Sequence, residues 1–161
     1  MEPHDLIVLT PPNPADSSLA IAACRAGAVG VLDLEFPPNP DVLATELSRL
    51  ARHAGNPFGV LLRSEADESL LEQLLAGPVK PHRLIFTGCH PTLPAVWRRA
   101  QEAGIEVFLE AVSISEAIHA GALGVAGLIL KGHEAAGRVG PDTSFVLIQK
   151  WKQQANRTGV T

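Results

Sequence analysis

Short apolar runs alternate along the whole chain with segments of helical periodicity, and this alternation constrains the fold more than any other feature. The apolar runs are rich in Val, Ile and Leu and are bounded by Gly and Pro, as buried strands are. The predicted strands span residues 6–9, 29–34, 58–62, 84–86, 106–111 and 125–130. The predicted helices span residues 16 or 17 to 27, 41–53, 66–75, 93–103, 115–120 and 144–155. Nearly continuous apolar strands separated by single amphipathic helices indicate an α/β fold with a parallel sheet covered by helices.

Helix ends carry recognisable signals. We expect Asp16 or Ser17 to cap the first helix at its N-terminus and Gly27 to end it. The sequence Ala-Gly-Ala-Val-Gly-Val at 26–31 recurs as Ala-Gly-Ala-Leu-Gly-Val at 120–125, with a looser copy at 103–107. Each copy is expected to mark a helix that turns into the next strand, which supports a repeated βα unit.

A TIM-type barrel fits this alternation better than an open, doubly wound sheet. Open sheets that bind dinucleotides carry Gly-x-Gly-x-x-Gly after the first strand, whereas the loop here is Thr10-Pro11-Pro12-Asn13-Pro14. A complete eight-fold barrel needs roughly 200 residues or more, and the chain has 161. We therefore expect residues 1–161 to form a single, incomplete TIM-type barrel domain of about six βα units.

Composition narrows the range of partners. Apolar residues make up 46% and charged residues 19%, so the chain is expected to fold. A net charge of −4, with five Phe, two Trp and no Tyr, argues against nucleic acid or an anionic membrane as a partner. The chain starts without the basic region of a signal peptide, and no apolar run reaches the ~18 residues of a membrane helix. Cys24 and Cys89 are too few for a disulfide framework. We expect a cytoplasmic protein whose partners are small molecules or proteins.

Polar residues follow every predicted strand. In parallel βα folds the loops at the carboxyl ends of the strands form the active face, so these residues are expected to share one rim. They are Thr10, Asp33 and Glu35, Arg63, Thr87 with Cys89 and His90, Glu110, and Lys131 with His133 and Glu134. Any one of them could instead be a solvated charge or a helix cap.

Two pairs on this rim have alternative interpretations. Glu110 and Lys131 end neighbouring strands, so they could form a part-buried ion pair, or Lys131 could offer its charge to an anionic ligand or a cofactor ring. Cys89 and His90 are adjacent residues, whose side chains point in opposite directions on extended backbone, so a thiol nucleophile with its base is disfavoured.

Residues 131–140, Lys-Gly-His-Glu-Ala-Ala-Gly-Arg-Val-Gly, form the most distinctive loop. Its glycines permit close backbone approach, and its charges lie between a predicted strand and a predicted helix. His133 is a candidate general acid or base, because its ordinary pKa lies near neutrality. Glu134 could orient His133 or cap a short helix.

This loop resembles a known family. Residues 127–140 are similar to the stretch after the sixth strand of nitronate monooxygenases, also called 2-nitropropane dioxygenases, which typically reads Gly-x-Glu-Ala-Gly-Gly-His. Residues 6–12 and 18–30 resemble the entry strand and first helix of those barrels. The closer resemblance is to such domains within polyketide and polyunsaturated fatty acid synthases, where Lys-Gly-His-Glu and Gly-Arg-Val-Gly variants occur. It covers essentially the whole chain.

The resemblance implies a barrel that binds flavin mononucleotide (FMN) over its strand ends, with a small-molecule or carrier-bound acyl substrate beside the loop after the sixth strand. The implied chemistry is flavin-mediated oxidation or enoyl reduction. The implied flavin contacts are Thr10, Pro11, Arg63, Glu110, Lys131 and Gly132. The implied catalytic residues are His133 and Glu134, and the implied substrate contacts are Gly137 and Arg138.

Two departures from the family pattern limit what carries over. Arg138 stands where the monooxygenases have their catalytic His, and Arg cannot act as a general base at working pH. Family barrels hold the flavin phosphate with loops after strands seven and eight, and Thr161 lies about where strand seven should begin. A six-stranded sheet cannot close, so we expect a fragment of a longer barrel or a half-barrel that pairs with the remaining strands or a second copy.

Two other functions remain as alternatives. The chain could be a non-catalytic scaffold or interaction module that keeps the βα architecture. A phosphate-binding βα enzyme of another class is less favoured, because these residues contain no glycine-rich anion loop.

Overall fold

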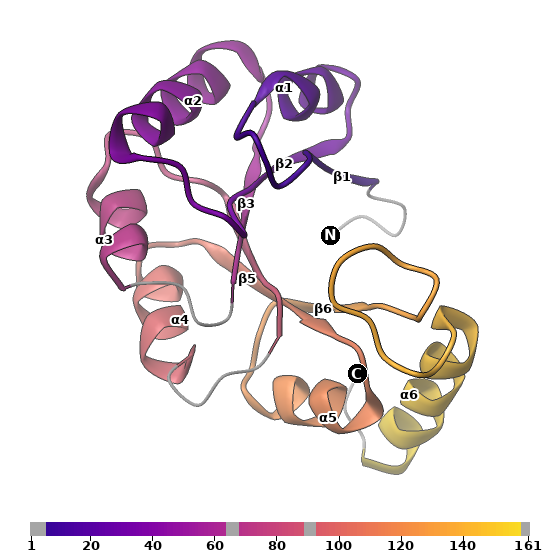
Figure 1. Cartoon of the computed structure of the whole chain (residues 1–161). Helices are drawn as coiled ribbons and strands as arrows, with labels where there is room; N and C mark the ends of the chain where they lie inside the picture. The colour runs from indigo at the N-terminus through magenta and orange to yellow at the C-terminus, as the bar shows by residue number, and fades with distance from the viewer. Residues whose placement is uncertain (1–5, 64–67, 89–92, 159–161) are drawn as a thin grey trace.

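Six parallel βα units curl into a half-barrel in the computed structural model of the chain, which describes residues 6–63, 68–88 and 93–158 (Figure 1). The strands are β1 (Ile7–Leu9), β2 (Val29–Asp33), β3 (Gly59–Leu62), β4 (Arg83–Phe86), β5 (Glu106–Ala111) and β6 (Gly127–Leu130). The helices are α1 (Ser18–Arg25), α2 (Pro40–His53), α3 (Glu68–Ala76), α4 (Leu93–Glu102), α5 (Ile114–Ala122) and α6 (Ser144–Thr158). The predicted elements are confirmed in type and order; residues 66 and 67 of one predicted helix lie outside the described residues.

The sheet keeps its strands in chain order, β1-β2-β3-β4-β5-β6, and each neighbouring pair is parallel. This confirms the prediction of a partial TIM-type barrel. No helix in the described part of the chain is both long and apolar enough to cross a bilayer.

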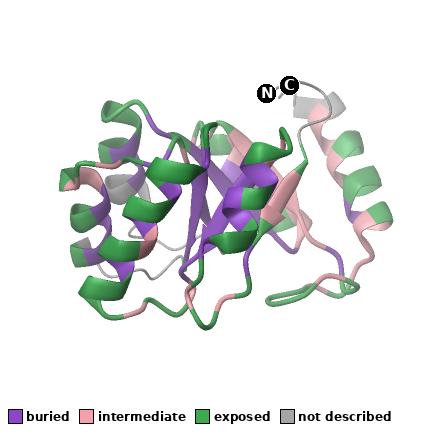
Figure 2. Cartoon of the chain, turned by 90° about the horizontal axis from the view of Figure 1, so that it is seen from above, coloured by how far each residue is buried: buried purple, intermediate pink, exposed green. Residues whose placement is uncertain are grey.

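The larger core lies between the convex face of the sheet and its helices. Every second strand residue points outward into it, including Leu32, Leu62 and Phe86, which are fully buried. Leu50 of α2 and Leu74 of α3 meet this layer from the helix side. Figure 2 shows the result: buried strands lie behind helices whose outer faces are exposed.

The intervening strand residues form a second, smaller core on the concave face. Val31, Leu61, Ile85 and Phe108 pack together there, and the backbone register places Leu61 beside Ile85 and Ile85 beside Phe108. The Phe108 ring covers Gly127 of the next strand, because a Cβ there would overlap the ring. This inner layer fills the middle of the half-barrel and lies below the carboxyl ends of the strands.

Ser17 occupies the N-cap position of α1 without capping it through its side chain, contrary to one of the two predictions for this helix start. Its hydroxyl donates instead to Glu46 on α2, at 2.6 Å. The Asp16 carboxylate accepts a hydrogen bond from the Ser18 amide at 2.9 Å, and hydrogen bonding to Ser18 lowers the pKa of Asp16. Ser17 therefore ties α1 to α2.

One copy of the sequence repeat, at 120–125, is shifted by three residues from the structural repeat. Gly27 and Gly104 adopt positive φ angles of 85° and 77° after their helices, as the repeat predicts. In the copy at 120–125 the residue with a positive φ angle is Gly124, at 71°, whereas Gly121, which the sequence aligns with Gly27, lies inside α5. Gly30 within β2 serves another purpose, since a Cβ there would overlap the Ala20 carbonyl of α1.

Replacing Gly30 or Gly127 by Ala tests this packing. We expect Gly127→Ala to lower the free energy of unfolding by about 1–3 kcal/mol, because the Phe108 ring must move, and Gly30→Ala to cost more, because backbone cannot yield. Urea denaturation measures both. Adding Phe108→Leu should recover stability only for Gly127→Ala. Equal recovery for both variants would contradict the packing of the Phe108 ring on Gly127.

Candidate functional site

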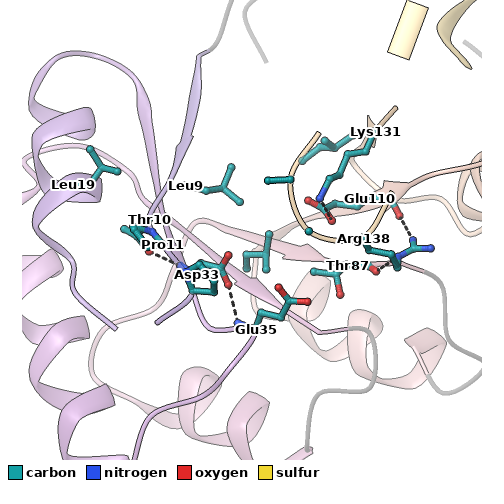
Figure 3. Close-up of a pocket in the computed structure, with 15 residues that line it drawn as sticks. Leu9, Thr10, Pro11, Leu19, Asp33, Glu35, Thr87, Glu110, Lys131 and Arg138 are labelled. Carbon is teal, nitrogen blue, oxygen red and sulfur yellow. Dashed lines mark hydrogen bonds and ion pairs between the residues drawn. The ribbon is translucent and has the colours of Figure 1, made fainter. Parts of the chain in front are cut away.

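A cavity of about 620 Å³ lies at the carboxyl ends of the strands (Figure 3). All six βα units contribute to its lining. Its apolar side chains include Leu9, Leu19, Leu61 and Ile129, and its ionisable ones are Asp33, Glu35, Glu110, Lys131 and Arg138. Its volume falls within the roughly 300–1,000 Å³ typical of small-molecule sites, which also combine apolar walls with a few polar groups.

Apolar residues from the inner layer form part of the cavity wall. Leu61 and Ile129 belong to β3 and β6, and both pack in or against the concave core. Leu9 at the end of β1 is 38% exposed, which leaves an apolar surface open to a ligand. These residues could contact the face of a flat ring.

Asp33 brings a buried carboxyl to the β2 side of the cavity. Its backbone amide donates to the Thr10 hydroxyl at 2.9 Å, and its Oδ1 accepts from the Glu35 amide at 2.8 Å. Only 7% of Asp33 is exposed. Burial raises the pKa of this carboxyl, and the hydrogen bond from Glu35 offsets the rise only in part. The cost of burying the charge makes Asp33 easier to protonate than an ordinary aspartate.

Glu110 and Lys131 form an ion pair across β5 and β6, with Lys131 Nζ 3.2 Å from Glu110 Oε2. The structure thus forms the ion pair that the sequence allowed, and both side chains also line the cavity. Burial raises the pKa of Glu110, and the charge of Lys131 opposes that rise without cancelling it. Figure 3 shows Glu110 and Lys131 on the side of the cavity opposite Asp33 and Glu35.

Arg138 reaches the cavity from the loop between β6 and α6, and its donors are directed to the protein. Its Nε donates to the Thr87 carbonyl at 2.9 Å. Its Nη1 and Nη2 donate to the two carboxylate oxygens of Glu116, at 2.9 and 2.8 Å. Hydrogen bonding from Arg138 lowers the pKa of Glu116. The guanidinium charge is therefore already neutralised before any ligand binds.

Several predicted site residues lie apart from the described cavity lining. Gly132, His133 and Glu134 are not in it, nor is Arg63, which follows β3 and is exposed. The Glu134 carboxylate accepts from the Ser144 amide at 2.8 Å at the start of α6, and hydrogen bonding to Ser144 lowers its pKa. Glu134 thus takes the helix-capping role. Catalysis by His133 and Glu134 stays a prediction.

Six of the ten residues that the resemblance implied do line the cavity. Thr10, Pro11, Gly137 and Arg138 line the cavity together with Glu110 and Lys131, so the structure gathers six of the predicted site residues around one space. His133 Nδ1 lies 3.4 Å from Glu134 Oε2 on a side chain that is 57% exposed. Cys89 and His90 lie outside the described residues.

Sequence reasoning missed one functional neighbour, Glu116 of α5. The signal was present, because Ser113-Ile114-Ser115-Glu116 has the spacing of a capping box. The Ser113 hydroxyl does accept from the Glu116 amide, at 3.3 Å. The Glu116 carboxylate accepts from the Val112 amide and binds Arg138 as well. Within the described residues there is no group of three or more His, Cys, Asp or Glu side chains placed to hold a metal ion.

Comparison with known proteins gives matches among solved structures. FabK from Thermotoga maritima superposes with a TM-score of 0.79 and 26% identity over 92% of this chain and 47% of that one. Its M276A mutant gives a TM-score of 0.80, with 26% identity over 95% and 51%. The half-barrel of this chain has the nitronate monooxygenase-like fold. A nitroalkane oxidase from Streptomyces ansochromogenes shares the fold, with a TM-score of 0.74 and 23% identity over 91% and 55%.

The chain spans about half the length of the solved structures that it matches. No protein-family model and no curated protein sequence matches it. The structural likeness therefore supports the fold that the resemblance implied, and the synthase context stays a prediction.

Asp33→Asn tests the buried carboxyl. We expect it to raise the free energy of unfolding at pH 7 by on the order of 1 kcal/mol, because the variant removes a charge that burial disfavours. A raised folded-state pKa means that wild-type stability falls as pH rises from the ordinary value of 3.8 toward the folded-state value. The advantage of the variant should therefore shrink as pH falls through the folded-state pKa of Asp33 and approach zero below 3.8, where the unfolded state also becomes protonated.

Chemical denaturation from pH 3.5 to 7.5 measures this difference. The control is Asp41→Asn, at an exposed position in the first turn of α2, which should gain no stability. A gain from Asp33→Asn that is constant with pH would contradict the proposed cause.

Proposed function

We propose that this chain supplies the flavin-ring site of a flavin-dependent oxidoreductase barrel, with FMN as the cofactor. The observation that carries this proposal is the cavity at the strand ends, which combines an apolar wall with the part-buried Glu110–Lys131 pair. The fold match to FabK and to a nitroalkane oxidase, an oxidoreductase by name, supports the proposal.

The lining residues fit the isoalloxazine ring of a flavin. That ring is flat, has an apolar edge, and carries carbonyl oxygens and one N–H at its polar end. Lys131 has three ammonium donors and gives one hydrogen bond to Glu110, so donors remain for a ring oxygen. The carboxyls of Asp33 and Glu110 could accept from the ring N–H or from hydroxyls of the ribityl chain. Leu9, Leu61 and Ile129 offer the apolar contact.

The same residues fit a phosphate group poorly. Arg138 gives its fork of donors to Glu116, and Lys131 is paired with Glu110. Asp33 and Glu35 add negative charge on the other side of the cavity. We infer that the FMN phosphate would bind outside the described lining, as the resemblance implies for loops after strands seven and eight.

Completion of the barrel is part of this proposal. In the described sheet β1 pairs only with β2 and β6 only with β5, so each end presents an edge. Exposed apolar side chains flank both edges: Leu6 and Leu9 at β1, Phe145 and Ile148 on α6. We propose that the remaining βα units of a longer polypeptide, or a second copy, cover these edges.

A bound flavin would supply the redox chemistry, as an acceptor or donor of hydride. Lys131 would orient the ring through its ammonium group, and the apolar wall would exclude water beside it. Asp33 and Glu110 could hold a proton at neutral pH more readily than ordinary carboxyls, because burial raises the pKa of each. The proposed substrate is a small molecule or a carrier-bound acyl chain beside Gly137, in a synthase of the polyketide or fatty acid type.

Flavin titration tests the proposal. FMN fluorescence quenching gives the affinity of the wild-type chain, of Glu110→Gln/Lys131→Met and of the control Lys152→Met, which replaces an exposed lysine. The double variant removes both buried charges together, so neither is left unpaired. We expect it to weaken binding about tenfold, as loss of one charged hydrogen bond would, and the control to have no effect.

Riboflavin serves as the second ligand, because it lacks the phosphate. We expect this chain to bind riboflavin and FMN with similar affinity. Absence of binding by the chain, and by a version extended through the remaining barrel units, would refute the flavin proposal and favour the scaffold alternative.

A further inference from the structure

The loop of residues 131–143 between β6 and α6 approaches the turn after β5 through its backbone and the end of β4 through the Arg138 side chain. Two backbone amides at the start of this loop bond to its end: the His133 amide donates to the Asp142 carbonyl, and the Gly132 amide to the Ser144 hydroxyl. Arg138, near its tip, instead donates to the Thr87 carbonyl after β4 and to Glu116 of α5. One side chain thus connects the loop tip to two neighbouring βα units.

The backbone packs closely around the Arg138 guanidinium and around the loop that carries it. A Cβ on Gly88 would lie 2.6 Å from Arg138 Nη2, so glycine provides the space in which the guanidinium sits. A Cβ on Gly140 would overlap the Val112 carbonyl, which shows how closely the loop approaches the turn between β5 and α5. The Val112 amide also donates to Glu116 Oε2, at 3.2 Å. Glu116 Oε2 therefore accepts from both the Val112 amide and Arg138 Nη2, and the Val112 amide helps to hold the carboxylate in place.

The loop carries two residues of the cavity wall, Ala136 and Gly137, directly before Arg138. A Cβ on Gly137 would lie 3.5 Å from Lys131 Nζ, so this part of the loop packs close to the lysine of the buried pair. Movement of the tip away from Glu116 would therefore open the wall beside Lys131.

We propose that Arg138 is a positioning residue, which clamps the loop to Glu116 and Thr87 and so closes the cavity wall beside Lys131. At this position, where the resemblance places a catalytic His, the guanidinium fixes the site without exchanging protons. The planar fork of arginine suits this task, because it meets both carboxylate oxygens and still donates through Nε; lysine cannot do so. The clamp itself stands on contacts within the chain, whereas its effect on ligand affinity rests on the proposed function.

Hydrogen exchange of the Gly132, His133 and Ala135 amides, which donate to Ser144, Asp142 and Gly132, tests the clamp without any ligand. We expect Arg138→Ala to speed their exchange at least about tenfold, the opening expected on losing charge-assisted hydrogen bonds, with slow exchange kept in β2 and β5. Glu116→Gln keeps the side-chain shape and should give a smaller increase. Arg99→Ala, which removes an exposed arginine paired with Glu72, is the matched control and should leave the loop unchanged.

Chemical rescue distinguishes positioning from general destabilisation. Millimolar methylguanidinium should restore slow loop exchange in Arg138→Ala, and should fail in Glu116→Ala/Arg138→Ala. Unchanged loop exchange in Arg138→Ala, or equal rescue with and without Glu116, would overturn the proposal. If Arg138→Ala does not fold, Arg138→Lys is the substitute, with the same expected direction.

FMN affinity gives the second readout. The flavin proposal and the clamp fail separately here: absence of flavin binding by the wild-type chain and by its extended version refutes the former, while exchange still decides the latter. If wild type binds, Arg138→Ala should weaken FMN binding, and methylguanidinium should restore it. Unaltered affinity in a variant with a mobile loop would contradict the role in closing the cavity wall.

Discussion

Parallel pairing of six strands in chain order is the constraint on which the rest of the structure depends. It brings all six carboxyl ends to one rim, whatever the sequence distance between them. Thr10 and Lys131 line one cavity for this reason alone, although most of the chain separates them. Alternation along each strand then divides the apolar side chains between a helix-covered layer and a small inner core. The inner core fills the middle of the half-barrel, and the cavity of about 620 Å³ lies above it at the carboxyl ends of the strands.

Charge distribution at that rim gives the cavity its chemical character. Its two cations are already paired, Lys131 with Glu110 and Arg138 with Glu116. Burial raises the pKa of both Asp33 and Glu110, so the cavity favours groups that donate hydrogen bonds to carboxylates or accept them from protonated carboxyls. An uncharged ring with both donors and acceptors suits this environment better than an anion does. A barrel completed by further strands would then be the source of phosphate-binding groups.

Much of the architecture could be predicted from the sequence because it depends on periodicity and local signals. Apolar runs bounded by Gly and Pro defined the strands, and parallel topology placed Glu110 beside Lys131. Other features depend on tertiary contacts that no local pattern encodes. Ser17 bonds to Glu46 on another helix rather than capping its own. Arg138 and Glu116 are separated by 22 residues and meet only because a loop without periodicity folds back over β5. The same loop directs Glu134 to the start of α6, whereas the sequence allowed Glu134 either to cap a helix or to orient His133.

Methyl NMR spectra of the Ile, Leu and Val side chains, recorded during FMN titration, test the central claim most directly. The cavity walls contain Leu9, Leu61 and Ile129, whereas Ile7 and Val29 lie on the same concave face toward the amino ends of the strands. The account predicts ring-current shifts concentrated at the first three residues, with little change at the other two. Shifts centred on Ile7 and Val29, or no shifts at saturating FMN, would contradict a flavin site at the strand ends.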